Sequence, residues 1–243
     1  MLETMTSDPI VEAIFEIRFT ANTEAAAAIL IGQLHHSLRP EYPKSERLPI
    51  NDIPLEVRNK NESLHFAPEM RISGHCKSIH VGRNCLGVTV SSPYPGWVSY
   101  KKSIMRVLEL AFEAEVIEVV NRAAFRYINV ISAIEKDESD YDVIEFDGNI
   151  GGYNLKEVDT GLKFTTKKDD ISHTVQVKNN SIAKFIDAKE KVSGLLLDID
   201  TSLSKDMPEF WGSSSEILDS VRNAERRMFE QIVKSTTLDR YKK

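Results

Sequence analysis

Two aspartates in the C-terminal part of the chain have a spacing that could hold a metal ion. Asp198 and Asp200 lie in the segment LLLDIDT, residues 195–201. Because alternate residues of a strand point to the same face, both carboxylates would lie on one face, about 7 Å apart. Such a pair could hold Mg²⁺ with a third acid or a phosphate. We favour the simpler interpretation, the solvent face of an amphipathic strand, because no recognisable motif completes the site.

A second polar group lies in the apolar segment FRYIN, which contains Arg126, Tyr127 and Asn129. An arginine in the middle of an apolar strand needs a partner, because burying an unpaired charge is unfavourable. Glu12 or Glu16 could supply the carboxylate if the first strand is a neighbour. One hypothesis is an anion-binding or carboxylate-binding cleft. The other, which we favour, is a structural ion pair that determines how the strands pair.

The sequence YPGW, residues 94–97, places Tyr94 and Trp97 on a turn that contains proline and glycine. Aromatic side chains on a rigid turn can anchor a protein partner. They can also fill the junction between a hairpin and a helix. We favour the packing role, because large aromatic side chains mostly serve the core.

Thiols and imidazoles do not form a recognisable site. His75 and Cys76 are adjacent, so on a strand they would point to opposite faces, and a turn at residues 82–84 keeps Cys76 from facing Cys85. The set His75, Cys76, His80 and Cys85 therefore predicts neither a zinc site nor a disulfide. The familiar nucleotide-binding, metalloprotease, hydrolase and kinase motifs are absent as well. We expect no cofactor, and the question of catalysis stays open with a preference for none.

The composition is that of an ordinary globular chain with an acidic balance. Its 243 residues carry a formal net charge of −6, which disfavours a broad phosphate-binding surface. Basic doublets at residues 101–102, 167–168 and 226–227 are short and typical of solvated surface. The first residues, MLETMTSDP, lack the features of a signal peptide, and no apolar run reaches the roughly 20 residues of a membrane span. We expect a cytoplasmic protein with no membrane partner and without a nucleic-acid partner.

The segment PIVEAIFEIRF, residues 9–19, is the element around which the other elements are organised. Its apolar residues recur at every second position and predict a half-buried central strand. The expected core face carries Val11, Ala13, Phe15, Ile17 and Phe19, and the other face carries Glu12, Glu16 and Arg18 with Ile10 and Ile14. The segment around FRYIN is apolar on both faces, so we expect a second central strand, covered on both sides.

We predict an α+β fold of two lobes, residues 1–135 and 143–243, joined by the charged segment 135–142. Each lobe would pack helices on one face of a mostly antiparallel sheet. Turn residues predict hairpins at 82–84 and 159–161, and the S-x-x-E pattern of Ser213 and Glu216 predicts the start of the last helix. One continuous domain is the alternative, because the linker is short.

With PIVEAIFEIRF at the start, YPGW in the middle, FRYIN after it and LLLDID before the last helix, the chain resembles a sporadically distributed bacterial and archaeal family of uncharacterised proteins of about this length. The resemblance supplies no catalytic residues. The patchy distribution of that family implies a place in defence islands, toxin–antitoxin loci or prophage.

These observations favour a non-enzymatic binding protein: an antitoxin, immunity or sensor component that recognises a protein encoded by a neighbouring gene. A homodimer is the alternative partner. Two other functions stay open: a metal-dependent enzyme that uses Asp198 and Asp200, and a nucleic-acid-binding module with a local basic face.

Overall fold

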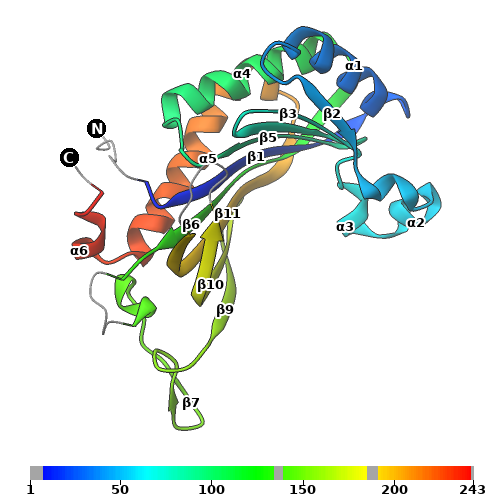
Figure 1. Ribbon diagram of the computed structural model, residues 1–243. Coiled ribbons are helices and arrows are strands. Elements are labelled where there is room, and N and C mark those ends of the chain that lie inside the picture. Colours follow the sequence, from blue (N-terminus) through cyan, green and yellow to red (C-terminus); the bar gives the residue numbers. More distant parts are fainter. Residues whose placement is uncertain (1–7, 134–138, 185–190, 242–243) are drawn as a thin grey trace.

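The computed structural model describes residues 8–133, 139–184 and 191–241. It has a mixed α+β fold built on one nine-stranded sheet in the order β2-β3-β4-β5-β1-β6-β11-β10-β9 (Figure 1). Every pairing recorded between these strands is antiparallel. The predicted class, helices with a mostly antiparallel sheet, is therefore confirmed.

The strands of the large sheet are β1 (Ile10–Ala21), β2 (Lys44–Arg47), β3 (Met70–Gly74), β4 (Lys77–Val81), β5 (Cys85–Ser91), β6 (Ile117–Ile131), β9 (Gly161–Lys168), β10 (Ile171–Lys184) and β11 (Lys191–Met207). A separate small pair contains β7 (Asn149–Ile150) and β8 (Tyr153–Asn154). The helices are α1 (Ala26–Leu38), α2 (Leu55–Lys60), α3 (Glu62–His65), α4 (Trp97–Glu113), α5 (Phe210–Ile232) and α6 (Ser235–Leu238), with short 3-10 turns η1 (Pro49–Asp52) and η2 (Asp140–Val143).

Strand β1 lies at the centre of the sheet, as its period of two predicts. It pairs with β5 along one edge and with β6 along the other. Its buried side chains are Ala13, Phe15, Ile17 and Phe19. Val11 departs from the predicted face: the register shifts between Ile10 and Glu12, and Val11 lines a hollow on the opposite side of the sheet.

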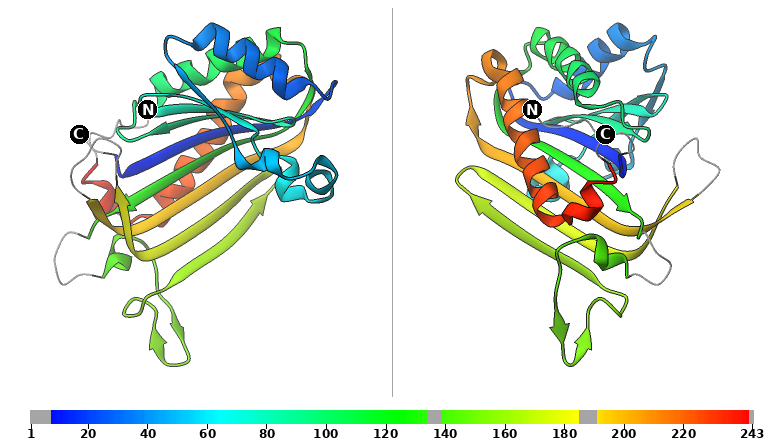
Figure 2. Two further views of the ribbon diagram at one scale, coloured as in Figure 1. Left: turned by 45° about the vertical axis from the view of Figure 1, so that its right-hand side comes forward. Right: turned by 90° about the vertical axis from the view of Figure 1, so that its left-hand side faces the viewer.

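The helices α1, α4 and α5 cover one face of the sheet (Figures 1 and 2). Their apolar stripes and the inward residues of the strands form one large core, which a smaller cluster around β10, β11 and the end of α5 extends. Tyr100 anchors α4 to the sheet. Its buried hydroxyl lies 3.1 Å from the carbonyl oxygen of Ala13 and 2.7 Å from that of Val88. Hydrogen bonds to two neighbouring strands set the position of the helix above them.

The two predicted halves are joined in one sheet by the pairing of β6 with β11. Strand β6 pairs with β1 and also with β11, so strands from both halves form one sheet. The order of elements repeats: β1 precedes β3–β5 and α4, and β6 precedes β9–β11 and α5. This continuity is what the single-domain alternative requires. The lobe boundary stays a prediction, and residues 134–138 of the proposed linker lie outside the described residues.

Two local predictions were wrong. No hairpin turns at residues 159–161: β9 begins at Gly161 and pairs with β10, while β8 pairs with β7. The side chain of Asn179 holds this stretch instead, because it accepts from the amide of Thr160 and donates to the carbonyl of Val158. The helix predicted as the last is α5, which begins at Phe210, so the predicted cap Ser213 lies inside it. Phe210 is fully buried in the core, which favours extending the helix to include it.

Gly194 marks a close approach between β11 and β6, and it generates a testable prediction. A Cβ at this position would overlap the carbonyl oxygen of Ile131, whereas a Cβ at Gly32 of α1 would meet nothing within 4 Å. We expect Gly194→Ala to lower the free energy of unfolding by about 2 kcal/mol. Gly32→Ala should raise it by up to about 1 kcal/mol, because alanine favours helix. Denaturant unfolding of both variants measures the two changes in the free energy of unfolding. Equal changes would contradict the close approach of β11 and β6 at Gly194.

Candidate functional site: the helix-free face of the sheet

The face of the sheet opposite α1, α4 and α5 is called the open face below. Among the described residues, no helix lies over its centre (Figure 2). The expectation that helices or strands cover β6 on both sides is therefore wrong. On the three central strands, the open face carries Glu12, Ile14, Glu16 and Arg18 of β1, Arg122, Ala124, Arg126, Ile128 and Val130 of β6, and Leu196, Asp198, Asp200 and Ser202 of β11.

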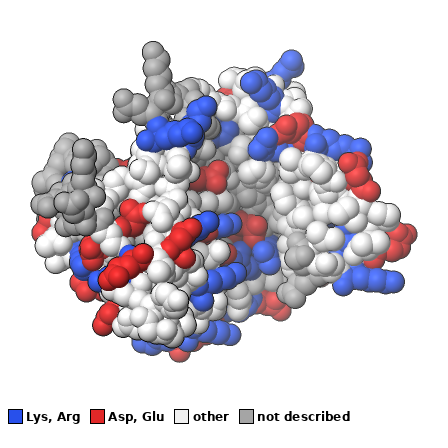
Figure 3. Space-filling view, turned by 60° about the horizontal axis from the view of Figure 1, so that its bottom comes forward, with Lys and Arg blue, Asp and Glu red and all other residues white. Residues whose placement is uncertain are grey.

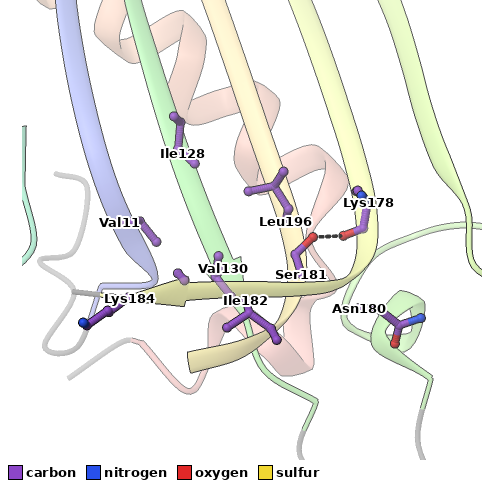
Figure 4. A pocket seen from close by; sticks show the side chains of 10 residues that line it. Val11, Ile128, Val130, Lys178, Asn180, Ser181, Ile182, Lys184 and Leu196 are labelled. Atoms are coloured by element: carbon purple, nitrogen blue, oxygen red, sulfur yellow. Dashed lines mark hydrogen bonds between the residues drawn. The ribbon is translucent and has the colours of Figure 1, made fainter. Parts of the chain in front are cut away.

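Both ends of the open face are bounded. At one end stand α2 and α3, where the guanidinium carbon of Arg18 lies 4.7 Å from the ring centroid of Phe66. At the other end, β10 changes register after Lys178, and its residues 181–184 pair with residues 191–194 of β11 as a projecting arm. Figure 4 shows this arm crossing the ends of the central strands. The open face thus consists of strands, with α2 and α3 projecting at one end and the arm of β10 and β11 projecting at the other.

A chain of ion pairs crosses the three central strands. Arg122 bonds with Glu16 of β1 at 2.9 Å and with Asp200 of β11 at 2.9 Å. Glu16 also accepts from Arg18 at 2.8 Å. Arg122 thus pairs with an acid on each neighbouring strand, and Arg18 pairs with the same Glu16. These ion pairs hold the side chains in place without a ligand. Arg122 was not among the predicted site residues, although it lies four residues before Arg126 on the same strand and must therefore share its face.

Arg126 forms a second, bidentate pair on the same face. Its Nε and one terminal nitrogen lie 2.8 Å and 2.6 Å from the two carboxylate oxygens of Asp198. The side chain of Asp198 is 7% exposed and that of Arg126 is 42% exposed. These hydrogen bonds raise the pKa of Arg126. Strands β1 and β6 are neighbours, which was the condition for Glu12 or Glu16 to pair with Arg126. Neither does so in the structure, because β11 lies on the other side of β6 and offers a closer acid.

Asp198 and Asp200 share one face, as their spacing predicts, but each already accepts hydrogen bonds from an arginine. Among the described residues, no group of three or more acidic, histidine or cysteine side chains is placed to hold a metal ion. Glu12 is half-buried on the same face, and burial raises its pKa while the positive charge of Arg126 opposes the rise. The arginines thus occupy the oxygens that a cation would need.

The other predicted binding residues lie on the opposite side of the sheet from Arg126. Tyr127 and Tyr94 meet on the helix side, with their hydroxyl oxygens 3.3 Å apart. Asn129 is buried there and donates to the carbonyl of Leu197. The alternation in FRYIN already separates Arg126 from its two companions. The five residues therefore do not form one site.

Trp97 contacts both long helices, whereas the packing role that we favoured for the YPGW turn was to fill the junction between a hairpin and a helix. It begins α4 and donates through its ring nitrogen to Asp219 of α5 at 3.1 Å. Lys101 bonds to the same carboxylate at 2.7 Å, and the guanidinium of Arg222 lies over the Trp97 ring. The turn thus links α4 to α5 above the sheet.

Cys85 is buried and Cys76 is half-buried, and the two do not form a disulfide with each other. Burial raises the pKa of the Cys85 thiol well above its ordinary value, so that thiol is not reactive. Burial also lowers the pKa of His80, which keeps its imidazole neutral.

A hollow that was not predicted from the sequence lies at the arm end of the open face. Its volume is about 560 Å³. Its apolar lining comes from Val11, Ile128, Val130, Ile182, Ala183 and Leu196, and its polar lining from Lys178, Asn180, Ser181 and Lys184 (Figure 4). The signal in the sequence was the pair Asn179 and Asn180, which interrupts a strand at the point where β10 bends.

No family model and no curated protein matches the chain. The resemblance to a sporadically distributed family therefore stays a prediction. None of the described helices has the length and apolar character needed to cross a lipid bilayer.

The pairing of Arg126 with Asp198 leads to a prediction about stability. Arg126→Met leaves the nearly buried Asp198 without its cation, and we expect the free energy of unfolding to fall by about 2 kcal/mol. Lys205→Met is the control. Both side chains of the Lys205–Asp170 ion pair are exposed, so the pair should contribute about 0.5 kcal/mol or less to the free energy of unfolding. Denaturant unfolding measures both. If Arg126→Met lowers stability while partner binding is unchanged, the binding role of Arg126 fails.

Glu225 of α5 gives a prediction about pH. Burial raises its pKa to about 8, against the opposing charges of Arg222 and Arg226. The folded protein therefore binds this proton more tightly than the unfolded chain does. The stability that the protonated group contributes is present below the ordinary pKa of 4.5 and is lost as the pH rises towards about 8.

We expect the free energy of unfolding to fall across this range by at most about 1.4 kcal/mol per pH unit. Glu225→Gln should remove that part of the slope, and the exposed Glu109→Gln on α4 should not. Denaturant titrations at a series of pH values test this. Identical slopes for the wild-type protein and Glu225→Gln would show that Glu225 is ionised in the folded state.

Proposed function

We propose that the protein is a non-enzymatic binding component that recognises a protein partner through the open face. The observation that carries the proposal is the arrangement of the three central strands: helices cover one face of β1, β6 and β11, and the opposite face carries ordered charges beside apolar residues. A rigid sheet loses little conformational entropy when a partner docks. Arg122 and Arg126 are already held by carboxylates, so their ordering adds little to that loss.

The distribution of charge supports a protein partner. In Figure 3, which brings the underside of the molecule forward, basic and acidic side chains are interspersed without a continuous tract of one sign. A nucleic-acid site normally needs a basic tract that follows the phosphates. Of the predicted basic doublets, Lys101 bonds to Asp219 and Arg226 to Glu230. These two doublets belong to helices of the covered side. Lys167 of the third doublet lies on the open face, because it pairs with Ser172, which pairs with Ser202 of β11.

The enzyme hypothesis has less support. It depends on Asp198 and Asp200, and both carboxylates already neutralise arginines. A divalent cation would have to displace those arginines and leave them unpaired.

The resemblance suggests a biological setting for a binding component. An antitoxin, immunity or sensor role in the cytoplasm, with a partner encoded by a neighbouring gene, agrees with the absence of familiar catalytic motifs in the sequence. A homodimer through the open face is the alternative assembly.

A capture experiment from the native host tests the proposal. Tagged wild-type protein is compared with Ile14→Arg, which adds a charge at the centre of the open face opposite Arg126. The matched control is Val98→Arg on α4. Val98 is 82% exposed and lies on a helix that packs against the other face of the sheet. We expect the wild-type protein and the control to retain a stoichiometric partner, identified by mass spectrometry, and Ile14→Arg to lose at least about 90% of it.

Thermal unfolding of the three proteins confirms that each is folded before capture. Equal recovery of the partner by Ile14→Arg and Val98→Arg would place the interface elsewhere. Recovery of nucleic acid in place of protein, with binding that weakens as salt rises, would favour the nucleic-acid alternative.

A further inference from the structure

The hollow at the arm end of the open face combines two features that restrict what could occupy it. Its floor is apolar and belongs to adjacent strands: Ile128 and Val130 of β6 lie beside Leu196 of β11. The arm adds Ile182, whose side chain is 67% exposed. An exposed isoleucine over an apolar floor leaves surface from which a ligand could exclude water. The volume of about 560 Å³ lies within the range of ordinary ligand sites.

The charges at the rim are both positive. Lys178 and Lys184 are exposed and lie on opposite sides of the hollow (Figure 4). Among the described residues that line the hollow, none carries a carboxylate. The rim thus differs from the centre of the open face, where each arginine of β6 is already neutralised by an aspartate. An occupant with a negative charge on each side of an apolar part would complement both lysines at once.

We propose that the hollow receives a short segment of the partner protein in which apolar side chains are flanked on both sides by acidic residues. This inference rests on the proposed function and names the partner's chemistry. The apolar side chains lie on Ile128, Val130 and Leu196 beneath the arm, and the flanking carboxylates contact Lys178 and Lys184. A fatty acid fits less well, because it carries one charge at one end and would leave one lysine without a counter-charge.

Three synthetic peptides test the inference, each acetylated, amidated and carrying the same fluorescent label. The first has the sequence Glu-Leu-Ile-Leu-Glu, the second replaces both acids by glutamine, and the third replaces the three apolar residues by serine. Fluorescence anisotropy measures their binding to the full-length protein. We expect the first peptide to bind at least about fivefold more tightly than either of the others, and its affinity to fall as salt rises.

Variants of the rim locate the binding. The double substitution Lys178→Gln and Lys184→Gln should weaken binding of the first peptide by about five- to tenfold. Ile182→Ser should weaken it by a similar factor. The matched controls Lys102→Gln and Val98→Ser, on exposed positions of α4, should leave it unchanged. All five positions are exposed, so each variant should keep the unfolding temperature of the wild-type protein.

The inference is overturned if the first peptide does not bind, if the glutamine peptide binds equally well, or if the lysine variant retains full affinity. Tighter binding of dodecanoate than of any peptide would also overturn it in favour of an amphiphile. Its failure can be separated from that of the proposed function. A partner that is lost from Ile14→Arg but kept by the lysine variant leaves the open face as the interface and excludes the hollow.

Discussion

The guanidinium groups of Arg122 and Arg126 project from the middle of β6, where each needs a carboxylate within hydrogen-bonding reach. Asp200 and Asp198 of β11 supply these carboxylates, and Glu16 of β1 supplies a third. A shift of β6 by one residue would turn both arginines into the core beneath the helices. Apolar alternation and charge pairing therefore select the same register. Because the charges are already neutralised among themselves, the open face is stable without a helix over it.

Much of this arrangement could be predicted from local sequence patterns. The period of two in residues 9–19 was enough to predict β1, its position at the centre and most of its buried face. The same alternation in FRYIN separates Arg126 from Tyr127. The acid that binds Arg126 could not be predicted, because the adjacency of β6 and β11 depends on contacts between residues far apart in sequence.

Elements held by side chains from elsewhere also escaped prediction. The turn signal at residues 159–161 was misleading, because the side chain of Asn179 holds that stretch. The capping pattern at Ser213 placed the start of α5 too late, because the burial of Phe210 extends the helix. The hollow depends on the bend in β10 and on the arm that follows it. A local pattern of polar and apolar residues does not encode such a bend, so no sequence signal beyond the two asparagines pointed to it.

A binding surface on a sheet has different properties from one on loops. The backbone of β6 is hydrogen-bonded on both sides, so side chains on its open face change position only by changing rotamer. The net charge of the chain is −6, yet the described residues that line the hollow include two lysines and no acid. The charged side chains that line the hollow in the described part of the chain are therefore opposite in sign to the net charge of the chain. That contrast would help an acidic segment find the hollow in preference to the rest of the surface.

The central position of β1 also affects the order in which the chain folds. Its partner β6 lies roughly a hundred residues further along the chain, so at about 5 to 20 residues per second a ribosome needs about 5 to 20 s to make it. During that interval the edge of β1 that later pairs with β6 has no partner strand. Glu12, Glu16 and Arg18 alternate with its apolar residues, and charges in such positions keep an unpaired strand from adding to strands of other chains. The residues that later build the open face thus protect the nascent chain before the sheet exists.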